Sequence, residues 1–442
     1  MKPLRLLGRF FVIAVVVWVA LVVYVLGRAR TLLVRDREAR RVAIARLRGR
    51  TLREGMARLG ATFVKLGQVL STRPDLFDPE LIDELRRLQD QLPPFPTADA
   101  RRILEEDLGC PIADRFASFD EPVAAASVAQ VHRAHLRDGT EVAVKVLRPD
   151  VRARVERDAA ILLAGARVLE LVPSVRASEP RAHLEHFVQG IVDQTDLRLE
   201  ADNYDRFREN FAGFDGVHFP RVYRGECGPR VLTMEFVRGV KIDALGPGDH
   251  GVVVERLRSA LLKMFFEDGF VHADLHPGNF VVMDNDEIAI FDVGLVKGLS
   301  EDMLVQYIDW NRCLVMGTTD DYVRHLKTYY VRDREDVDWD ALTRDVDAFA
   351  LSFRGKTAAE IEAKNLIDQA LAIGRKYGLR PVTEMTLIMV AVVTSEGVGK
   401  QLDPTSDSLG KIAEYLMPIL VKRGMLGGNA GAGAGAGKVG SS

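Results

Sequence analysis

The chain has 442 residues, of which 47% are hydrophobic and 28% charged, and its formal net charge is −3. This length allows two or three domains, or one two-lobed enzyme with extensions. Residues 1–60 carry a net charge of +11 and the remainder −14. A basic N-terminus before an acidic body favours a membrane surface over nucleic acid as the partner. The three cysteines form no CxxC pair, which predicts a reduced compartment without a disulfide framework or a zinc site.

An uncharged apolar run occupies Phe10–Leu26, and Gly27 extends it. Its length is at the short end of what spans a bilayer. Eleven arginines follow between residues 28 and 58, so we expect a retained single-pass anchor over 10–27 with the body in the cytoplasm. A cleaved signal peptide is an alternative, but no small-residue cleavage site follows the run. A buried or interfacial helix is the other alternative.

The segments around this run have distinct compositions. Residues 1–9 form a basic N-terminus, and 28–59 predict a basic juxtamembrane helix, either solvated or lying on anionic lipid. Residues 60–110 predict a helical extension with a turn near residue 73 and a Pro-rich stop before a last helix. Residues 426–442, rich in Gly and Ala, have no means of burying a core and predict disorder.

Two lobes of different character are expected in the body. Residues 111–240 predict a β-hairpin turning at Asp138-Gly139, helices over 151–172 and 181–211, and a strand pair near 218–236. Residues 241–425 predict a mostly helical lobe, beginning with a helix over 252–268 that has one apolar face. The apolar run 386–393 is too short to span a membrane and predicts a core helix.

The most informative segment is VHADLHPGNFVVMDNDEIAIFDVG, residues 271–294. Its centre predicts a tight hairpin turning at residues 284–286, so Asp274 and Asn279 share a loop and Asp292 ends the second strand. Phosphoryl transfer uses such a set: one carboxylate orients or deprotonates the acceptor, while an amide oxygen and a second carboxylate hold Mg²⁺ on the phosphates. An ordinary polar surface hairpin is the alternative interpretation.

Two further elements would complete a nucleotide site. Lys145 lies inside the apolar strand EVAVKV, where a lone lysine is usually solvated. Kinase-type sites pair this lysine with a helix glutamate, and Glu200 in DLRLEADN is the candidate. The loop before the lysine strand contains Ala124, Ala125, Ala126 and Ser127 where kinases have glycines, so it should be stiffer and hold the triphosphate differently.

FVKLGQ, AAASVAQVH, VAVKV, DLRLEADN, HADLHPGN and DVG, in this order, resemble the UbiB-type atypical kinase-like family, which includes the ADCK proteins. The resemblance covers residues 60–404. It implies an α+β, two-lobed protein-kinase-like fold with an N-terminal helical KxGQ extension, here preceded by a single transmembrane helix. It further implies ATP and Mg²⁺ as ligands.

Residue roles follow from the same resemblance. Asp274 would be the catalytic-loop aspartate, Lys145 and Glu200 the nucleotide-orienting ion pair, and Asn279 and Asp292 the Mg²⁺ ligands. The nucleotide would also contact the Ala-rich loop of Ala124, Ala125, Ala126 and Ser127, and the backbone near Glu235. Lys65, Gln68 and Asp196 would belong to the KxGQ lid.

Two positions depart from the family pattern. Gln194 replaces a family glutamate and cannot form an ion pair with Lys65, which puts the locking of the lid in doubt. Val293 replaces the phenylalanine of Asp-Phe-Gly, so Asp292 is kept but the aromatic packing is lost.

The resemblance implies a membrane-anchored ATPase or kinase that supports isoprenoid-quinone or prenyl-lipid biosynthesis, with water or a small lipid-like acceptor. Its partners would be a nucleotide, a membrane lipid or prenyl-quinone precursor, and quinone-biosynthesis proteins, but no nucleic acid. The main alternative is a catalytically silent nucleotide-binding scaffold or lipid chaperone. A small-molecule phosphotransferase is a third possibility, although such an enzyme needs neither the KxGQ lid nor a membrane anchor.

Overall fold

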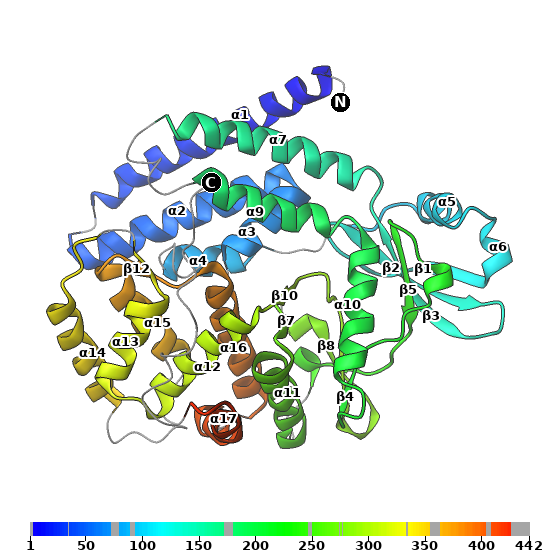
Figure 1. The fold of residues 1–442 in the computed structure, drawn as a ribbon. Coiled ribbons are helices and arrows are strands. Elements are labelled where there is room, and N and C mark those ends of the chain that lie inside the picture. The colour runs from blue at the N-terminus through cyan, green and yellow to red at the C-terminus, as the bar shows by residue number, and fades with distance from the viewer. Residues whose placement is uncertain are drawn as a thin grey trace, which may run out of the picture. The chain divides into compact units, whose positions relative to one another are not determined.

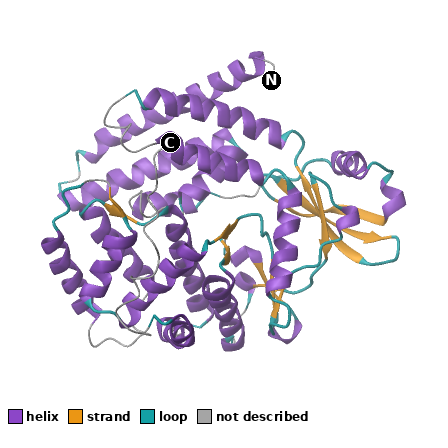
Figure 2. Cartoon of the chain, viewed as in Figure 1, coloured by secondary structure: helices purple, strands orange, loops and turns teal. Residues whose placement is uncertain are grey.

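The structure is a computed structural model that divides the chain into two compact units (Figures 1 and 2). Unit 1 comprises Met1–Ile242 with Asn279–Leu295, and unit 2 comprises Asp243–Gly278 with Val296–Ser442. The described residues are 3–33, 35–71, 79–88, 93–171, 180–245, 250–273, 275, 277–332, 335–353, 363–403 and 408–425. The predicted disordered tail lies outside them.

A layer of helices forms one part of unit 1. Its members are α1 (Pro3–Thr31), α2 (Arg37–Leu59), α3 (Ala61–Leu70), α4 (Pro79–Arg86), α7 (Val151–Leu169) and α9 (Pro180–Asp193). In Figure 1, α1, α2 and α7 run side by side. Asp36 caps α2 by accepting a 2.7 Å hydrogen bond from Ala39 N, a contact typically worth about 1 kcal/mol. Buried side chains from the first four helices form one apolar cluster, which includes Ile13, Met56, Phe63 and Leu85.

An antiparallel sheet forms the other main part of unit 1. Its strands are β1 (Phe116–Ala125), β2 (Ala129–Leu136), β3 (Glu141–Leu147) and β5 (Val231–Glu235), in the order β1-β2-β3-β5. The predicted hairpin is β2–β3, and Gly139 supplies the positive φ of 87° that its turn requires. Helix α5 (Thr97–Leu108) covers one face and buries Ile103 and Leu104 against the alternating valines of β3. Short α6 (Ile112–Arg115) leads into β1, and α10 (Leu197–Asn210) follows α9.

A smaller sheet in unit 1 contains the second predicted hairpin. Its order is β4-β9-β8-β6, with β4 (Val217–His218), β6 (Val240–Lys241), β8 (Phe280–Val282) and β9 (Ile288–Ile290). The turn between β8 and β9 lies at Asp284–Asp286, as predicted, and Asn285 and Asp286 have φ of 64° and 59°. Asn and Asp tolerate this left-handed conformation better than most side chains. Short 3₁₀ turns at Arg224–Glu226, Ile242–Ala244 and Pro277–Asn279 complete the connections.

Unit 2 is mostly helical, as predicted. Its helices are α11 (Gly251–Lys263), α12 (Glu301–Met316), α13 (Thr319–Tyr329), α14 (Trp339–Phe353), α15 (Ala363–Lys376), α16 (Thr383–Leu402) and α17 (Ser408–Arg423). A π-helical turn, Met264–Asp268, continues α11. Two strand pairs, β7 (Phe270–His272) with β10 (Val296–Gly298) and β11 (Val331–Arg332) with β12 (Leu379–Arg380), complete it. The predicted apolar face of the first helix is buried, including Val253, Leu257 and Leu261.

Candidate functional site

Lys145 lies between two carboxylates in unit 1. Its Nζ is 2.8 and 2.9 Å from the two Oε atoms of Glu200 and 2.8 Å from Oδ1 of Asp292. The side chains of Lys145 and Glu200 are 13% and 6% exposed, whereas that of Asp292 is 43% exposed. We call these three residues the Lys145 cluster. It has a buried anchor in Glu200 and a carboxylate open to solvent in Asp292.

The alternation of β3 explains the position of Lys145. Val142, Val144 and Val146 are fully buried on the face that packs on α5. Successive side chains of a strand point to opposite faces, so Lys145 lies on the other face. There it meets Glu200, which belongs to the buried side of α10.

Helix α10 also positions Asp292. Tyr204 Oη, one turn after Glu200 and fully buried, accepts a 3.0 Å hydrogen bond from Asp292 N. Asn203 Nδ2 donates a 2.8 Å hydrogen bond to Val293 O. Asp292 has a φ of 52°, a left-handed conformation that is uncommon for non-glycine residues but that Asp tolerates better than most. Helix α10 therefore holds the segment after β9 by two backbone groups, the N of Asp292 and the O of Val293.

The charges of the cluster set the protonation of its members. Burial alone would lower the pKa of Lys145, but the charges of Asp292 and Glu200 outweigh it and raise that pKa, so the ammonium form is strongly favoured. Burial raises the pKa of Glu200, and the charge of Lys145 only partly opposes it because Asp292 acts in the same direction as burial. Lys65 also acts on Glu200 and lowers its pKa. The cluster thus pairs one ammonium group with two carboxyl groups, of which that of Asp292 is the one open to solvent.

Asn279 is brought to this region by the β8–β9 hairpin. Phe280 pairs with Ile290, and Phe291 N donates a 2.9 Å hydrogen bond to Asn279 O. Asn279 thus lies opposite the residue before Asp292. Asp274, the predicted catalytic-loop aspartate, lies outside the described residues.

The predicted Ala-rich loop is only partly a loop: Ala124 and Ala125 end β1 and pair with β2, and Ala126 and Ser127 lie in the tight turn that follows. Ala126 N donates a 2.8 Å hydrogen bond to Ala129 O, and Ser127 is buried. Arg148, beyond the end of β3, donates from Nε to Ala126 O at 2.9 Å and from its backbone N to Val128 O at 2.8 Å. Ala124 is exposed. These contacts hold the loop as a stiff turn rather than an open flap.

The KxGQ residues lie on α3, and the glycine of this motif is closely packed against neighbouring side chains. A Cβ on Gly67 would lie 2.2 Å from Leu88 Cδ1 and 2.7 Å from Met56 Sδ, so a side chain here would force Leu88 and Met56 to shift. Gln68 Nε2 donates to Leu88 O at 3.4 Å. Lys65 acts electrostatically on Glu200, as described above.

Asp196 is placed differently from its predicted partners in the lid. It is the N-cap of α10, where its carboxylate accepts from Arg198 N at 3.2 Å and pairs with the Arg198 guanidinium at 2.9 and 2.6 Å. Hydrogen bonding to Arg198 holds its pKa below the ordinary value. This ion pair supports the helix that carries Glu200 and Asn203.

Glu235 ends β5 opposite Val142. Its carboxylate is 2.9 Å from His218 Nε2 and accepts from Arg221 N at 3.2 Å. The hydrogen bond from His218 lowers the pKa of Glu235. Its backbone N also donates to Arg221 O at 2.8 Å, so both groups are used inside unit 1 and the nucleotide contact at Glu235 stays a prediction.

Several supporting residues escaped the sequence reasoning. Tyr204 holds Asp292 and Asn203 holds Val293. The helical spacing of Glu200, Tyr204 and Phe207 on one face is the signal that could have revealed Tyr204. Arg148 carried no comparable signal, because an arginine after a strand is usually solvated.

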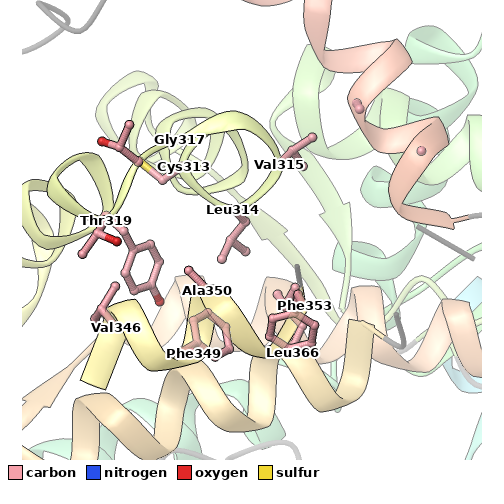
Figure 3. A pocket seen from close by; sticks show the side chains of 14 residues that line it. Cys313, Leu314, Val315, Gly317, Thr319, Val346, Phe349, Ala350, Phe353 and Leu366 are labelled. Carbon is pink, nitrogen blue, oxygen red and sulfur yellow. The ribbon is translucent and has the colours of Figure 1, made fainter. Parts of the chain in front are cut away.

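Unit 2 holds a second cluster of ionisable groups and an apolar cavity. Asp309 accepts from Arg312 and lies 2.8 Å from His325 Nδ1, with Cys313 Sγ at 4.0 Å. The Arg312 guanidinium already neutralises Asp309, so these residues form a buried ion pair. The adjoining cavity, about 400 Å³, is lined by residues such as Leu314, Phe349 and Leu366 (Figure 3). The described residues that line it include none that is charged, so they offer no cationic side chain for phosphate.

Comparisons with known proteins show the family to which this chain is similar. Residues 87–325 match the ABC1 atypical kinase-like domain and residues 346–407 the UbiB helical domain. Probable protein kinase UbiB of Pseudomonas aeruginosa is 33% identical over 386 residues, covering 81% of this chain and 69% of that protein. An uncharacterized protein of Synechocystis sp. is 33% identical over 391 residues, covering 86% of this chain but 56% of that protein. The chain thus spans little more than half the length of that relative.

A solved structure gives independent support for the fold. The complex of Rv3197 with erythromycin from Mycobacterium tuberculosis has a TM-score of 0.55 and 21% sequence identity, covering 80% of this chain and 91% of that one. At this identity the likeness shows the fold alone. Because the kinase-like domain matches more than half of the chain and relatives one-third identical extend over most of it, this chain belongs to the ABC1/UbiB family of atypical kinase-like proteins.

Proposed function

We propose that the protein is an ATP-dependent phosphoryl-transfer enzyme, with Lys145, Glu200 and Asp292 at its nucleotide site. The observation that carries the proposal is the Lys145 cluster, a lysine fixed by a buried glutamate beside an exposed aspartate. A surface hairpin has no reason to bury three charged groups, because removing charges from water costs free energy unless they pair with one another. Kinase-type sites use the same three groups for nucleotide phosphates.

The chain's own residues fit ATP and Mg²⁺ by their chemistry. Asp292 presents a solvent-accessible carboxylate and Asn279 an amide oxygen, and hard cations such as Mg²⁺ prefer oxygen ligands. Glu200 would keep Lys145 oriented while the ammonium group of Lys145 moves from Asp292 toward the phosphates. Asp274 would orient the acceptor, either water or a small lipid-like molecule. When bound, Mg²⁺ would offset charge on the phosphates.

The cellular role is proposed from the family. Relatives carry the name probable protein kinase UbiB, and we propose that this chain supports isoprenoid-quinone or prenyl-lipid biosynthesis. Helix α1 would attach it to the membrane, because among the described helices it is the one long and apolar enough to cross a bilayer. Its partners would be a membrane lipid or prenyl-quinone precursor and other biosynthetic proteins. Helix α1 would attach the protein to the membrane either by crossing it once, with the body in the cytoplasm, or by lying in its plane.

A silent scaffold is the second candidate, and the substitution at Val293 favours it. The side chain there is fully buried and lacks the aromatic ring found in active kinases of this general type. Such a protein would bind nucleotide and turn it over negligibly.

The deciding experiment measures Mg²⁺-dependent ATP hydrolysis and ATP binding by the full chain on anionic liposomes. Asp274→Asn and Asp292→Asn are the test variants. Asp286→Asn, on the same hairpin, is the control because the residue is exposed and Asn tolerates its positive φ. If the protein is an enzyme, the wild type and the control should hydrolyse ATP, and both test variants should lose this activity. If the protein binds ATP but none of the four proteins hydrolyses it, the enzyme proposal is wrong and the scaffold proposal replaces it.

A further inference from the structure

Helix α1 has one face that is docked on the rest of unit 1. The half-buried and buried residues of this face recur at the spacing of successive helical turns: Leu6, Arg9, Ile13, Val16, Val19, Ala20, Tyr24, Gly27 and Thr31. The face combines apolar side chains with the polar Arg9 and Thr31, and Gly27 allows a close approach to its neighbour. This pattern is typical of a helix that packs against protein along its whole length.

The contacts of this face fix α1 antiparallel to α2. Near the start of α1, Arg9 Nη2 donates to Leu59 O at 2.7 Å, at the end of α2. In the middle, a Cβ on Gly55 would lie 3.9 Å from Val16. Near the end, Gly27 approaches Leu47 so closely that a Cβ would lie 2.8 Å from its Cδ atoms.

An ion pair also joins α1 to α7. Arg9 donates to both carboxylate oxygens of Asp158, at 2.6 and 2.9 Å. The Asp158 side chain is only 3% exposed, so removal of α1 would leave a buried carboxylate without this partner. Bidentate pairs of this kind are among the strongest charge-assisted contacts.

The remaining surface of α1 is apolar and exposed. Twelve large apolar side chains between Leu7 and Leu26 are exposed, including Phe10, Phe11 and Trp18. Monomeric soluble proteins rarely leave so long an apolar surface uncovered. Arg28 and Arg30, exposed at the C-terminal end, suit the headgroup region of an anionic membrane.

A docked α1 cannot cross a bilayer, because α2 would accompany it. The part of α2 that lies beside α1, from Leu47 to Leu59, carries five charges: Arg48, Arg50, Arg53, Glu54 and Arg58. Charged side chains are strongly unfavourable at the centre of a bilayer. Docking and spanning therefore exclude each other.

We propose that α1 lies in the plane of the membrane, immersed in one leaflet by its exposed apolar face, while Arg9 and Asp158 hold its other face on α7 and α2. The surface is thus a monotopic lipid-binding face, with anionic phospholipid as its partner. Interfacial helices of this kind sit about 5–10 Å into the headgroup–acyl boundary. The proposal rests on the membrane association proposed above and specifies its geometry.

Trp18 lies near the middle of the apolar run, so its depth distinguishes the two geometries. The full chain is reconstituted in anionic vesicles containing lipid brominated either near the headgroup or near the chain end. Subtracting the signal of Trp18→Phe removes the contribution of the other two tryptophans. The in-plane helix predicts stronger quenching of Trp18 by the headgroup-proximal bromines, whereas a spanning helix places Trp18 near the bilayer centre.

The outcomes separate this inference from the membrane association beneath it. Strongest quenching by the chain-end bromines would overturn the in-plane helix and leave membrane attachment intact. No quenching by either lipid would overturn both, as would a lipid-free dimer that shields Trp18.

A charge swap tests the ion pair that holds α1. Arg9→Glu should release α1 and shift the quenching toward the chain-end bromines, and adding Asp158→Arg should restore the shallow position. Arg154→Glu, a charge reversal at an exposed arginine of α7, is the matched control and should leave the depth unchanged. An unchanged depth in Arg9→Glu would refute the role of the ion pair.

Discussion

Replacing Glu200 with glutamine isolates the charge that fixes Lys145. The substitution keeps the shape of the side chain but removes a carboxylate that contacts Nζ at 2.8 and 2.9 Å. Hydrogen bonds to charged groups contribute about 1.5–3 kcal/mol. Lys145 keeps Asp292 at 2.8 Å, so the loss should stay below the roughly 3–5 kcal/mol of a fully orphaned buried charge.

Part of this loss is recovered, because burial raises the pKa of Glu200 and so makes its ionised form costly. We expect unit 1 to lose about 1–2 kcal/mol and its Tm to fall by roughly 3–6 °C. ATP affinity should fall about tenfold, equivalent to about 1.4 kcal/mol, because Lys145 then pairs with Asp292 alone and competes with Mg²⁺ for that carboxylate.

Thermal unfolding followed by circular dichroism and calorimetric titration with ATP and Mg²⁺ measure the two effects. Glu209→Gln, an exposed position on the same helix, is the control and should change neither quantity appreciably. A Glu200→Gln protein that is as stable as the wild type and binds ATP equally well would refute the role assigned to the Lys145 cluster.

Three further predictions follow from buried positions. Gly67→Ala should lower the free energy of unfolding by about 1–3 kcal/mol, because its Cβ would collide with Leu88; a denaturant melt with unchanged midpoint would contradict the packing. Val293→Phe should cost a similar amount, about 1–3 kcal/mol, since Val293 is fully buried; a higher Tm would instead show room for the aromatic ring. Burial lowers the pKa of His132 below 6.5, so below that pH the unfolded chain binds a proton that the folded chain does not. Stability should therefore be fully present above pH 6.5 and decline as the pH falls, and His132→Phe should reduce that slope by up to about 1.4 kcal/mol per pH unit; equal slopes in chemical unfolding from pH 7 to 5 would rule this out.

Local pattern was sufficient for the elements and for most of the site's members. Alternation in VAVKV predicted a strand with Lys145 opposite the buried valines, and the polar turn at residues 284–286 predicted the hairpin that brings Asn279 opposite the residue before Asp292. These features depend on residues close in sequence, and strand periodicity or turn chemistry encodes them directly. The motif order likewise predicted the family that the comparisons show.

Partner choice was different, because it depends on which surfaces meet. No local pattern indicated that Tyr204 would hold Asp292, 88 residues away, or that Gly67 would pack against Leu88. Two short strands, β11 and β12, were also missed, because each has two residues and exists only by pairing with the other.

The N-terminal helix shows the same division most clearly. The sequence by itself determined a long apolar helix flanked by arginines, and it left spanning and interfacial positions both open. Only the tertiary structure decided which face of α1 meets protein, since that depends on Asp158, 149 residues away, and on α2 running antiparallel beside it. Hydropathy is a property of one segment, whereas docking is a property of the surfaces that long-range packing brings together.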